Sequence, residues 1–270
     1  MVAEGAASVH SPRQNRLLAA LPSADYERLL IDLELVRLQT GKVINEPGKS
    51  DHVHFPTTSM ISLLRDTEDG CSAETAMIGR EGMVGFAVFM GVGRAVVQTA
   101  GYSYRLRMAV LNREFERSGA LQDLLLRYAL YVLEQTGQNA TCNRYHSVLQ
   151  QFCRALLTRQ DRLSANELTV THELMANNLG VRREAVTAAA GVLRTAGLID
   201  YRRGRIIVLD RAALEAQACE CYAMLRERSL GVLPVESPTA VTVVRRQVLQ
   251  RRTRYATSAA SSVSSISVLR

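Results

Sequence analysis

Apolar and polar positions alternate in ways that divide the chain into a helical start, a strand-rich stretch and a helical second half. After a small, polar beginning, apolar residues recur at helical spacing, and Ser23 is the predicted cap of a helix over residues 24–33. From Glu34 to about Asn112, short alternating or apolar runs replace that spacing, with glycine and proline between them. Many short strands with regular turn signals predict a β-sandwich or jelly roll.

Helical spacing returns after this stretch. One face of a long segment ending near residue 143 is marked by Leu121, Leu124, Leu125, Tyr128, Val132 and Leu133. Such a face suits either a domain core or a partner helix in a dimer. A further helix is predicted over residues 147–159, a polar loop over 158–167, and a last helix over 211–228. A Pro/Ser-containing hinge and an Arg- and Ser-rich tail follow, and this tail is expected to be mobile.

Residues 171–195 follow the pattern of two short helices that cross. Thr171 is placed to cap the first helix, and Gly180 follows it where the chain must turn. The apolar and small positions that would fill the crossing are Met175, Ala176, Leu179, Val181 and Val186. This spacing is that of a helix-turn-helix motif.

The second helix of this pair carries polar residues on its outer face. Val186, Ala190 and Leu193 form the inner face, which leaves Arg182, Arg183, Glu184 and Thr187 outside, near the N-terminal end. An arginine can donate two hydrogen bonds to a guanine edge, and a glutamate can accept one from a cytosine amine. We therefore expect these four residues and Thr171 to contact double-stranded DNA.

A basic hairpin comes next. Residues 198–201 and 205–209 are predicted strands around Arg202, Arg203 and Gly204, and Arg205 begins the second strand. These three arginines would lie on a wing beside the helices and contact phosphates, which adds affinity without sequence information. From Thr171 to Leu209 the chain holds six arginines and three acidic residues, so its charge favours a polyanion.

Composition narrows the function classes further. The 270 residues are 47% hydrophobic and have a formal net charge of +7, which fits a globular protein with a polyanionic partner. No apolar run is long enough for a membrane span, and the first residues lack the apolar core of a signal peptide, so a cytoplasmic protein is expected. The five cysteines are scattered, and Cys219-Glu-Cys221, the one close pair, supplies half of a zinc site. We expect reduced thiols, no metal and no cofactor.

Enzyme motifs are incomplete. His172-Glu173 could begin the metalloprotease motif HExxH, but Ala176 stands where the second histidine is required. The serine elbow GxSxG and the phosphate-binding GxxxxGK[ST] loop are missing as well. No catalytic residue and no enzymatic activity are therefore expected.

The order of these features resembles the Crp-Fnr superfamily of bacterial transcription regulators. The resemblance spans about residues 16–228 and is strongest in the winged helix, in VHFPTTSMISLL and in IGREGMVG. It implies an α+β chain with a jelly-roll β-barrel at residues 16–118, a dimerisation helix at 119–145 and a winged helix-turn-helix domain at 146–228. Residues 229–270 form the tail. The implied partners are a two-fold-symmetric DNA operator and a second copy of the chain, with RNA polymerase as a further candidate.

The resemblance also assigns single residues. Arg183 and Glu184 match the base-reading pair of the family, and Arg182 a place often in contact with backbone. Ala188 departs from the cyclic-AMP-responsive members, which carry an arginine there, so their operator is not expected.

Members of the family that bind cyclic nucleotides have a glutamate that contacts the ribose and an Arg-Ser pair that contacts the phosphate. By this resemblance, Phe86 stands in place of the glutamate, and Arg94-Ala95 stands in place of the Arg-Ser pair. Arg94 is then the one remaining ligand-binding candidate, and control by cyclic AMP is not expected. An iron-sulphur cofactor is not expected either, because the members that carry one use cysteines near the N-terminus and this chain has none before Cys71.

Two alternatives remain. The chain could be a sensing module for a cyclic nucleotide or other small ligand that acts through a protein partner, but such a module would not need arginines on a wing. It could also bind nucleic acid without sequence preference through the five arginines between Arg245 and Arg254.

Overall fold

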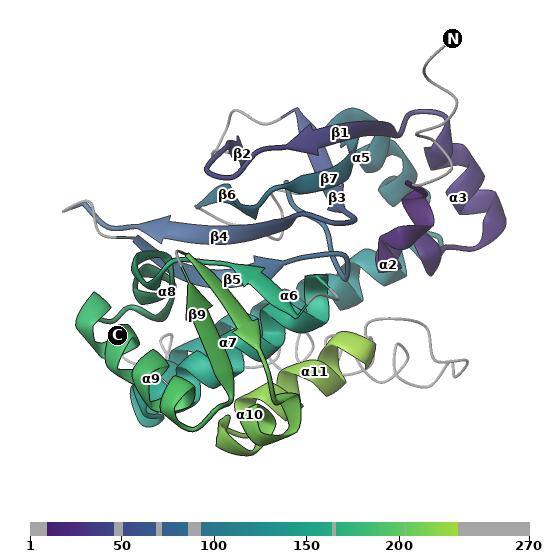
Figure 1. The fold of residues 1–270 in the computed structure, drawn as a ribbon. Coiled ribbons are helices and arrows are strands. Elements are labelled where there is room, and N and C mark those ends of the chain that lie inside the picture. The colour runs from purple at the N-terminus through teal and green to yellow at the C-terminus, as the bar shows by residue number, and fades with distance from the viewer. Residues whose placement is uncertain are drawn as a thin grey trace, which may run out of the picture. The chain divides into compact units, whose positions relative to one another are not determined.

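The computed structural model describes residues 10–45, 51–68, 72–85, 93–163, 166–202 and 204–231, with the side chains of 229–231 excepted. Figure 1 shows the elements and their labels. The Arg- and Ser-rich tail lies outside the described residues, apart from the last turn of the final helix.

Two antiparallel sheets form the strand-rich region, as the alternation predicted. One has the order β1-β7-β3 and the other β2-β6-β4-β5. Their bounds are β1 (Glu34–Leu38), β2 (Val43–Asn45), β3 (His52–Pro56), β4 (Met60–Asp66), β5 (Ser72–Ile78), β6 (Arg94–Thr99) and β7 (Gly101–Arg107). Among the described strands the sheets stay separate, so the roll is not a closed barrel.

The pairing of β3 with β7 shows why the alternation builds a core. Val53 lies opposite Leu106, and Phe55 lies opposite Tyr104. All four side chains are buried, in one apolar cluster with residues from the other sheet and from the first half of the long helix. Burial of this face is the main force that holds the roll together.

The entry helices differ in detail from the prediction. After a turn of 3-10 helix (Pro12–Gln14), they are α2 (Arg16–Ala19) and α3 (Ser23–Leu30). The cap assigned to Ser23 was wrong, because α3 begins at Ser23 itself and Pro22 precedes it with no side-chain cap bond. Asn15 caps α2, and its Oδ1 accepts from two backbone amides of that helix.

One helix replaces an expected strand. The strand period ends at Arg107, and α5 (Met108–Glu116) follows at once. Val110, Leu111 and Glu114 are its buried positions, which is helical rather than strand spacing. The prediction of a strand-rich region up to Asn112 was wrong at this end, because the apolar run Met-Ala-Val fits either period over so few residues.

The long helix α6 (Ala120–Tyr145) confirms the extended helical segment. Five of its six predicted face residues, Leu121, Leu124, Leu125, Tyr128 and Val132, are buried against the roll. The sixth, Leu133, is 67% exposed, and Leu126 and Leu130 on the same helix are exposed as well. The helix therefore has two apolar faces, and the roll covers only one.

The helices after α6 differ from the prediction at two places. Helix α7 (Val148–Leu163) continues through part of the expected polar loop, because Arg159, Gln160 and Arg162 are buried there and have hydrogen-bond partners. The expected last helix is broken into α10 (Arg211–Gln217) and α11 (Cys221–Gly231), with Ala218 in an extended conformation at the break.

A buried ion pair joins the roll to the helices. Arg162 Nε lies 2.8 Å from Glu81 Oε1, and the two side chains are only 8% and 6% exposed. Arg162 also donates to the hydroxyl of Tyr131 on α6 at 3.2 Å, and Glu81 accepts from the Gly79 amide. One carboxylate thus holds the β5 turn and α7 together, and the arginine extends the contact to α6.

Replacing Glu81 with alanine should lower the free energy of unfolding by about 3–5 kcal/mol, because Arg162 would keep a buried charge without its counterion. Denaturant titration measures the change. The exposed pair of Arg105 and Glu34 is the control, since side chains 38% and 60% exposed predict less than about 1 kcal/mol for Glu34→Ala. Equal losses of unfolding free energy in the two variants would contradict the role of the Arg162–Glu81 pair in joining the roll to α7.

Candidate functional site

The two crossing helices are present. They are α8 (His172–Leu179) and α9 (Arg183–Thr195). Thr171 caps α8 as expected, with its Oγ1 accepting from the Leu174 amide at 3.1 Å. Gly180 takes the left-handed conformation at φ 65°, and the Val181 amide donates back to the Ala176 carbonyl at 3.0 Å. This six-to-one bond ends the first helix and turns the chain into the second.

Buried apolar side chains fix the angle of the crossing. Met175 and Val186 are both fully buried, and Ala176 is 2% exposed. They belong to a second apolar cluster that also contains residues of α7 and of the hairpin. The small side chain of Ala176 lets the two helices approach closely.

The outer face of α9 carries the predicted polar residues. Arg182, Arg183, Glu184 and Thr187 are all exposed, and the first three lie at or before the first turn. Across the described ranges, neither Arg182 nor Arg183 makes an ion pair within the chain. Two guanidinium groups and one carboxylate therefore remain available at the helix N-terminus, where the backbone also favours an anion.

A three-stranded sheet forms the wing. Its order is β8-β10-β9, with β8 (Glu167–Thr169), β9 (Ile199–Arg202) and β10 (Arg205–Val208). The hairpin matches the prediction. Strand β8 (residues 167–169) was missed because it begins at the last residue of the expected polar loop, and a run of three residues gives little periodicity.

The wing arginines differ in their surroundings. The side chain of Arg202 is 81% exposed and lies 3.1 Å from Asp200, while that of Arg205 is 66% exposed and lies 2.9 Å from Glu167. Arg203 falls outside the described residues. Exposed pairs of this kind are weak, so a phosphate can compete for both guanidinium groups.

His172, the first residue of α8, contacts both α9 and the wing, a role that the sequence did not predict. Its Nδ1 lies 3.1 Å from the Thr187 hydroxyl on α9, and its ring stacks on that of Tyr201 in the wing at 4.2 Å. The same hydroxyl donates to the Arg183 carbonyl at 3.0 Å. Burial and the nearby charge of Arg183 lower the pKa of His172, which favours the neutral imidazole. A histidine at the start of a capped helix gave no signal beyond the failed metalloprotease motif.

The predicted ligand residue Arg94 is the first residue of β6 in the roll. Its guanidinium contacts Asp66 at 2.7 Å and 3.1 Å and the Ser72 hydroxyl at 3.1 Å. A phosphate at Arg94 would have to displace this carboxylate. Phe86 lies outside the described residues, and Ala95 is buried.

Four side chains of the kinds that bind metals lie close together at the C-terminal end of α6. They are Cys142, His146, Cys219 and Cys221. The expectation of no metal rested on the Cys219-Cys221 pair, which by itself supplies two ligands; Cys142 and His146, four residues apart, were not combined with that pair. That spacing was the available signal.

Comparison with known proteins agrees with this geometry. Residues 150–217 match the family described as Crp-like helix-turn-helix domain. No curated protein matches the chain.

Solved structures with the same fold include FixK2 from Bradyrhizobium japonicum, with a TM-score of 0.58 and 14% identity over 69% of this chain and 98% of that chain. Another is a CRP/FNR-family transcriptional regulator from Thermus thermophilus, with a TM-score of 0.54 and 22% identity over 68% of this chain and 98% of that chain. At this identity, the likeness shows the fold.

No helix within the described ranges has the length and apolar character needed to cross a membrane.

Gly180→Ala should lower the free energy of unfolding by about 1–2 kcal/mol, because a side chain disfavours the left-handed conformation. Gly191→Ala on α9 should instead raise it by about 0.5–1 kcal/mol, since alanine is the better helix residue. An added Cβ meets nothing within 4 Å at either glycine, so only the backbone conformation separates the two variants. Urea titration of both gives the comparison, and equal shifts would contradict the role of Gly180 in the turn.

Proposed function

From a Crp-like helix-turn-helix domain set on the fold of the Crp/Fnr regulators, we infer that the protein is a DNA-binding transcription regulator of the Crp-Fnr type. We propose further that it reads its operator with α9 and binds as a homodimer. The observation that carries the proposal is the exposed Arg183-Glu184 pair in the first turn of α9.

Arg183 and Glu184 are proposed to contact base edges in the major groove. The N-terminal end of a recognition helix enters the groove first, and both side chains lie there with no competing ion pair for Arg183 among the described residues. Thr187 contributes differently, because its hydroxyl already joins α9 to His172. We assign it the role of holding the helix, with any DNA contact made by its methyl group.

Backbone contacts are proposed for the flanking residues. Arg182 and Thr171 lie at the N-terminal ends of the two helices, where amide groups and positive partial charge favour phosphate. The wing arginines Arg202, Arg203 and Arg205 would hold the next phosphates. The alternative of a sensing module that acts only through a protein partner does not explain these exposed arginines. A protein with this partner acts in the cytoplasm, and RNA polymerase remains a second candidate partner.

Cyclic AMP is not proposed as the effector. Asp66 and Ser72 already bind the Arg94 guanidinium, and Ala95 supplies no hydroxyl donor. DNA titrations repeated with and without cyclic nucleotides should therefore give the same affinity.

The dimer is proposed to form along the uncovered face of α6. Leu126, Leu130 and Leu133 are 47%, 44% and 67% exposed, and the exposed residues Gly137 and Ala140 continue the same stripe. The spacing alternates between four and three residues, which is the seam of a coiled coil. Small residues at its end would let the paired helices approach closely.

Arg183→Ala should cost about 1–3 kcal/mol of binding free energy and relax the preference at one base pair of each half-site. Arg202→Ala should instead weaken binding to all sequences similarly, because phosphates are common to all of them. Selection from a random DNA pool supplies the operator, and titration at fixed salt compares the variants. Arg117→Ala, an exposed arginine after α5, is the control. Wild-type affinity in both test variants would contradict the assigned contacts.

Leu133→Glu should convert a dimer into a monomer at micromolar concentration, because it places a charge in the apolar seam. Sedimentation velocity measures the state. Arg127→Glu, on the flank of the same helix, introduces the same side chain away from the seam and should leave the dimer intact. A monomeric wild-type protein would rule out this interface.

A further inference from the structure

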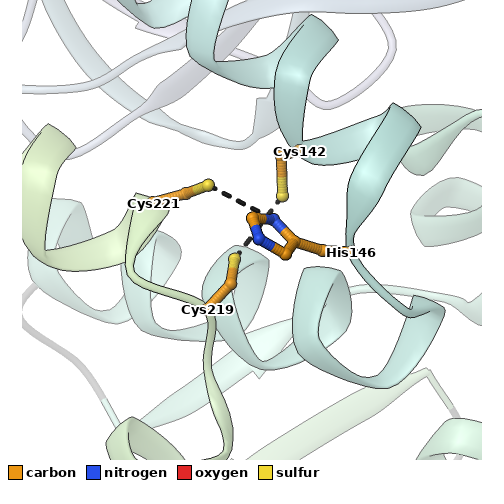
Figure 2. Close-up of side chains that lie close together, drawn as sticks. All are labelled: Cys142, His146, Cys219 and Cys221. Atoms are coloured by element: carbon orange, nitrogen blue, oxygen red, sulfur yellow. Dashed lines mark hydrogen bonds between the residues drawn. The ribbon is translucent and has the colours of Figure 1, made fainter.

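We propose that Cys142, His146, Cys219 and Cys221 form a tetrahedral site for one zinc ion. Figure 2 shows the three thiols and the imidazole pointing toward one another. Cys142 and His146 come from the end of α6, Cys219 from the link between α10 and α11, and Cys221 from the first position of α11. None of the four ligands belongs to α8, α9 or the wing, so the site shares no residue with the proposed DNA contacts.

The distances fit a single ion. All four ligand atoms lie within 4.8 Å of one another. The sulphurs of Cys142 and Cys219 are 3.5 Å apart, and the Cys221 sulphur is 3.4 Å from His146 Nδ1. Zinc bonds of ~2.3 Å to sulphur and ~2.0–2.1 Å to nitrogen place tetrahedral ligands about 3.5–3.8 Å apart. The side chains are therefore close to the positions that zinc requires.

The three cysteine side chains of the cluster are buried together, away from solvent. Cys142 and Cys221 are fully buried, and Cys219 is 4% exposed. These three cysteines form an apolar cluster of their own, separate from the two main cores. All three thiols are free, and a sulphur separation of 3.5 Å is far beyond the ~2.05 Å of a disulfide. Thiols gathered in this way, with an imidazole at the edge, are the ligand set of a structural zinc site.

Local structure brings the ligands together from two directions. Cys142 and His146 are four residues apart, so they share one face at the last turn of α6. His146 is also the first extended residue after that helix. Cys219 and Cys221 lie on either side of Glu220, at the break that divides the expected last helix. The break lets both cysteines face the same point, which an unbroken helix would not do for residues two positions apart.

Neighbouring groups would orient the ligands. His146 presents Nδ1 to the cysteines, and its Nε2 lies 3.2 Å from Glu220 Oε1. A carboxylate on the far nitrogen fixes the orientation of a metal-binding imidazole. Gln138 Nε2 lies 2.9 Å from the Cys221 sulphur, to which it can donate, and Gln151 donates to the His146 carbonyl at 2.8 Å.

The ligand set selects the metal. Sulphur and imidazole favour zinc over calcium or magnesium, which prefer oxygen. An iron-sulphur cluster is a poorer fit, because its thiolates bind different irons, whereas these four atoms converge on one point. Four protein ligands leave no open position for a substrate or for water, so the ion is structural.

Zinc at this point would brace the corner between α6 and α7. The ion would tie the start of α11 to the C-terminal end of α6, shortly before α7 begins, and α7 packs on the helix-turn-helix through the second core. Loss of the ion should therefore loosen α11 first. We expect chelation to lower the thermal stability of the whole chain.

The test measures metal content and coordination in the full-length protein expressed with added zinc. Elemental analysis should give one zinc per chain, and cobalt substitution should give the visible spectrum of tetrahedral thiolate ligation. Cys219→Ser and His146→Ala should lose the bound metal. Cys153→Ala is the matched control, because Cys153 is equally buried, is not among the four ligands, and burial raises the pKa of its thiol to about 12. This variant should keep one zinc.

A milder variant guards against loss of folding. Glu220 is 70% exposed on its side chain, so Glu220→Gln should fold and weaken zinc affinity by about 10–100-fold in competition with a chromophoric chelator. The proposal is overturned if the wild-type protein binds zinc no more tightly than Cys219→Ser, if it carries iron and sulphide instead, or if mass spectrometry finds a disulfide between Cys142 and Cys219. Failure of DNA binding would leave this result unchanged, so the two proposals are tested separately.

Discussion

The buried charge of Arg162 is the constraint on which the arrangement of roll and helices depends. A guanidinium taken out of water must be neutralised nearby, and Glu81 at the end of β5 is the group that does so. This requirement fixes the β5 turn against α7, and Tyr131 adds α6 to the same contact. Apolar packing alone would allow the helices to slide, because it has no direction, whereas an ion pair and hydrogen bonds define one position.

A second buried group organises the DNA-binding region in a similar way. His172 contacts α9 through Thr187 and the wing through Tyr201, while it begins α8 itself. The surface proposed to contact DNA therefore depends on a side chain outside it, since the position of Arg183 follows from that of α9.

Helix α6 serves three purposes along one length. One side completes the core of the roll, and the opposite side carries the leucine stripe of the proposed dimer. Its last turn supplies two ligands of the proposed zinc site. A helix can do this because residues three or four apart share a face, so one sequence can encode separate stripes.

Local sequence patterns were enough to predict most of the element order and the proposed recognition helix. Strong local signals carried both: two-residue alternation in the strands, the cap at Thr171, the glycine at 180 and the polar outer face of α9. Features that depend on residues far apart in the chain could be read only from the folded structure. Leu133 belonged to a face that suited either a core or a partner helix, and it is exposed because the roll covers only one side of α6. Residues 158–163 were predicted as part of a polar loop, but they are helical, and Arg159 and Arg162 are buried there. Cys142 and Cys219 are 77 positions apart, and only folding brings their sulphurs to 3.5 Å. Periodicity records the neighbours of a residue within its own element, whereas ion pairs, metal sites and uncovered faces arise from the contacts between elements.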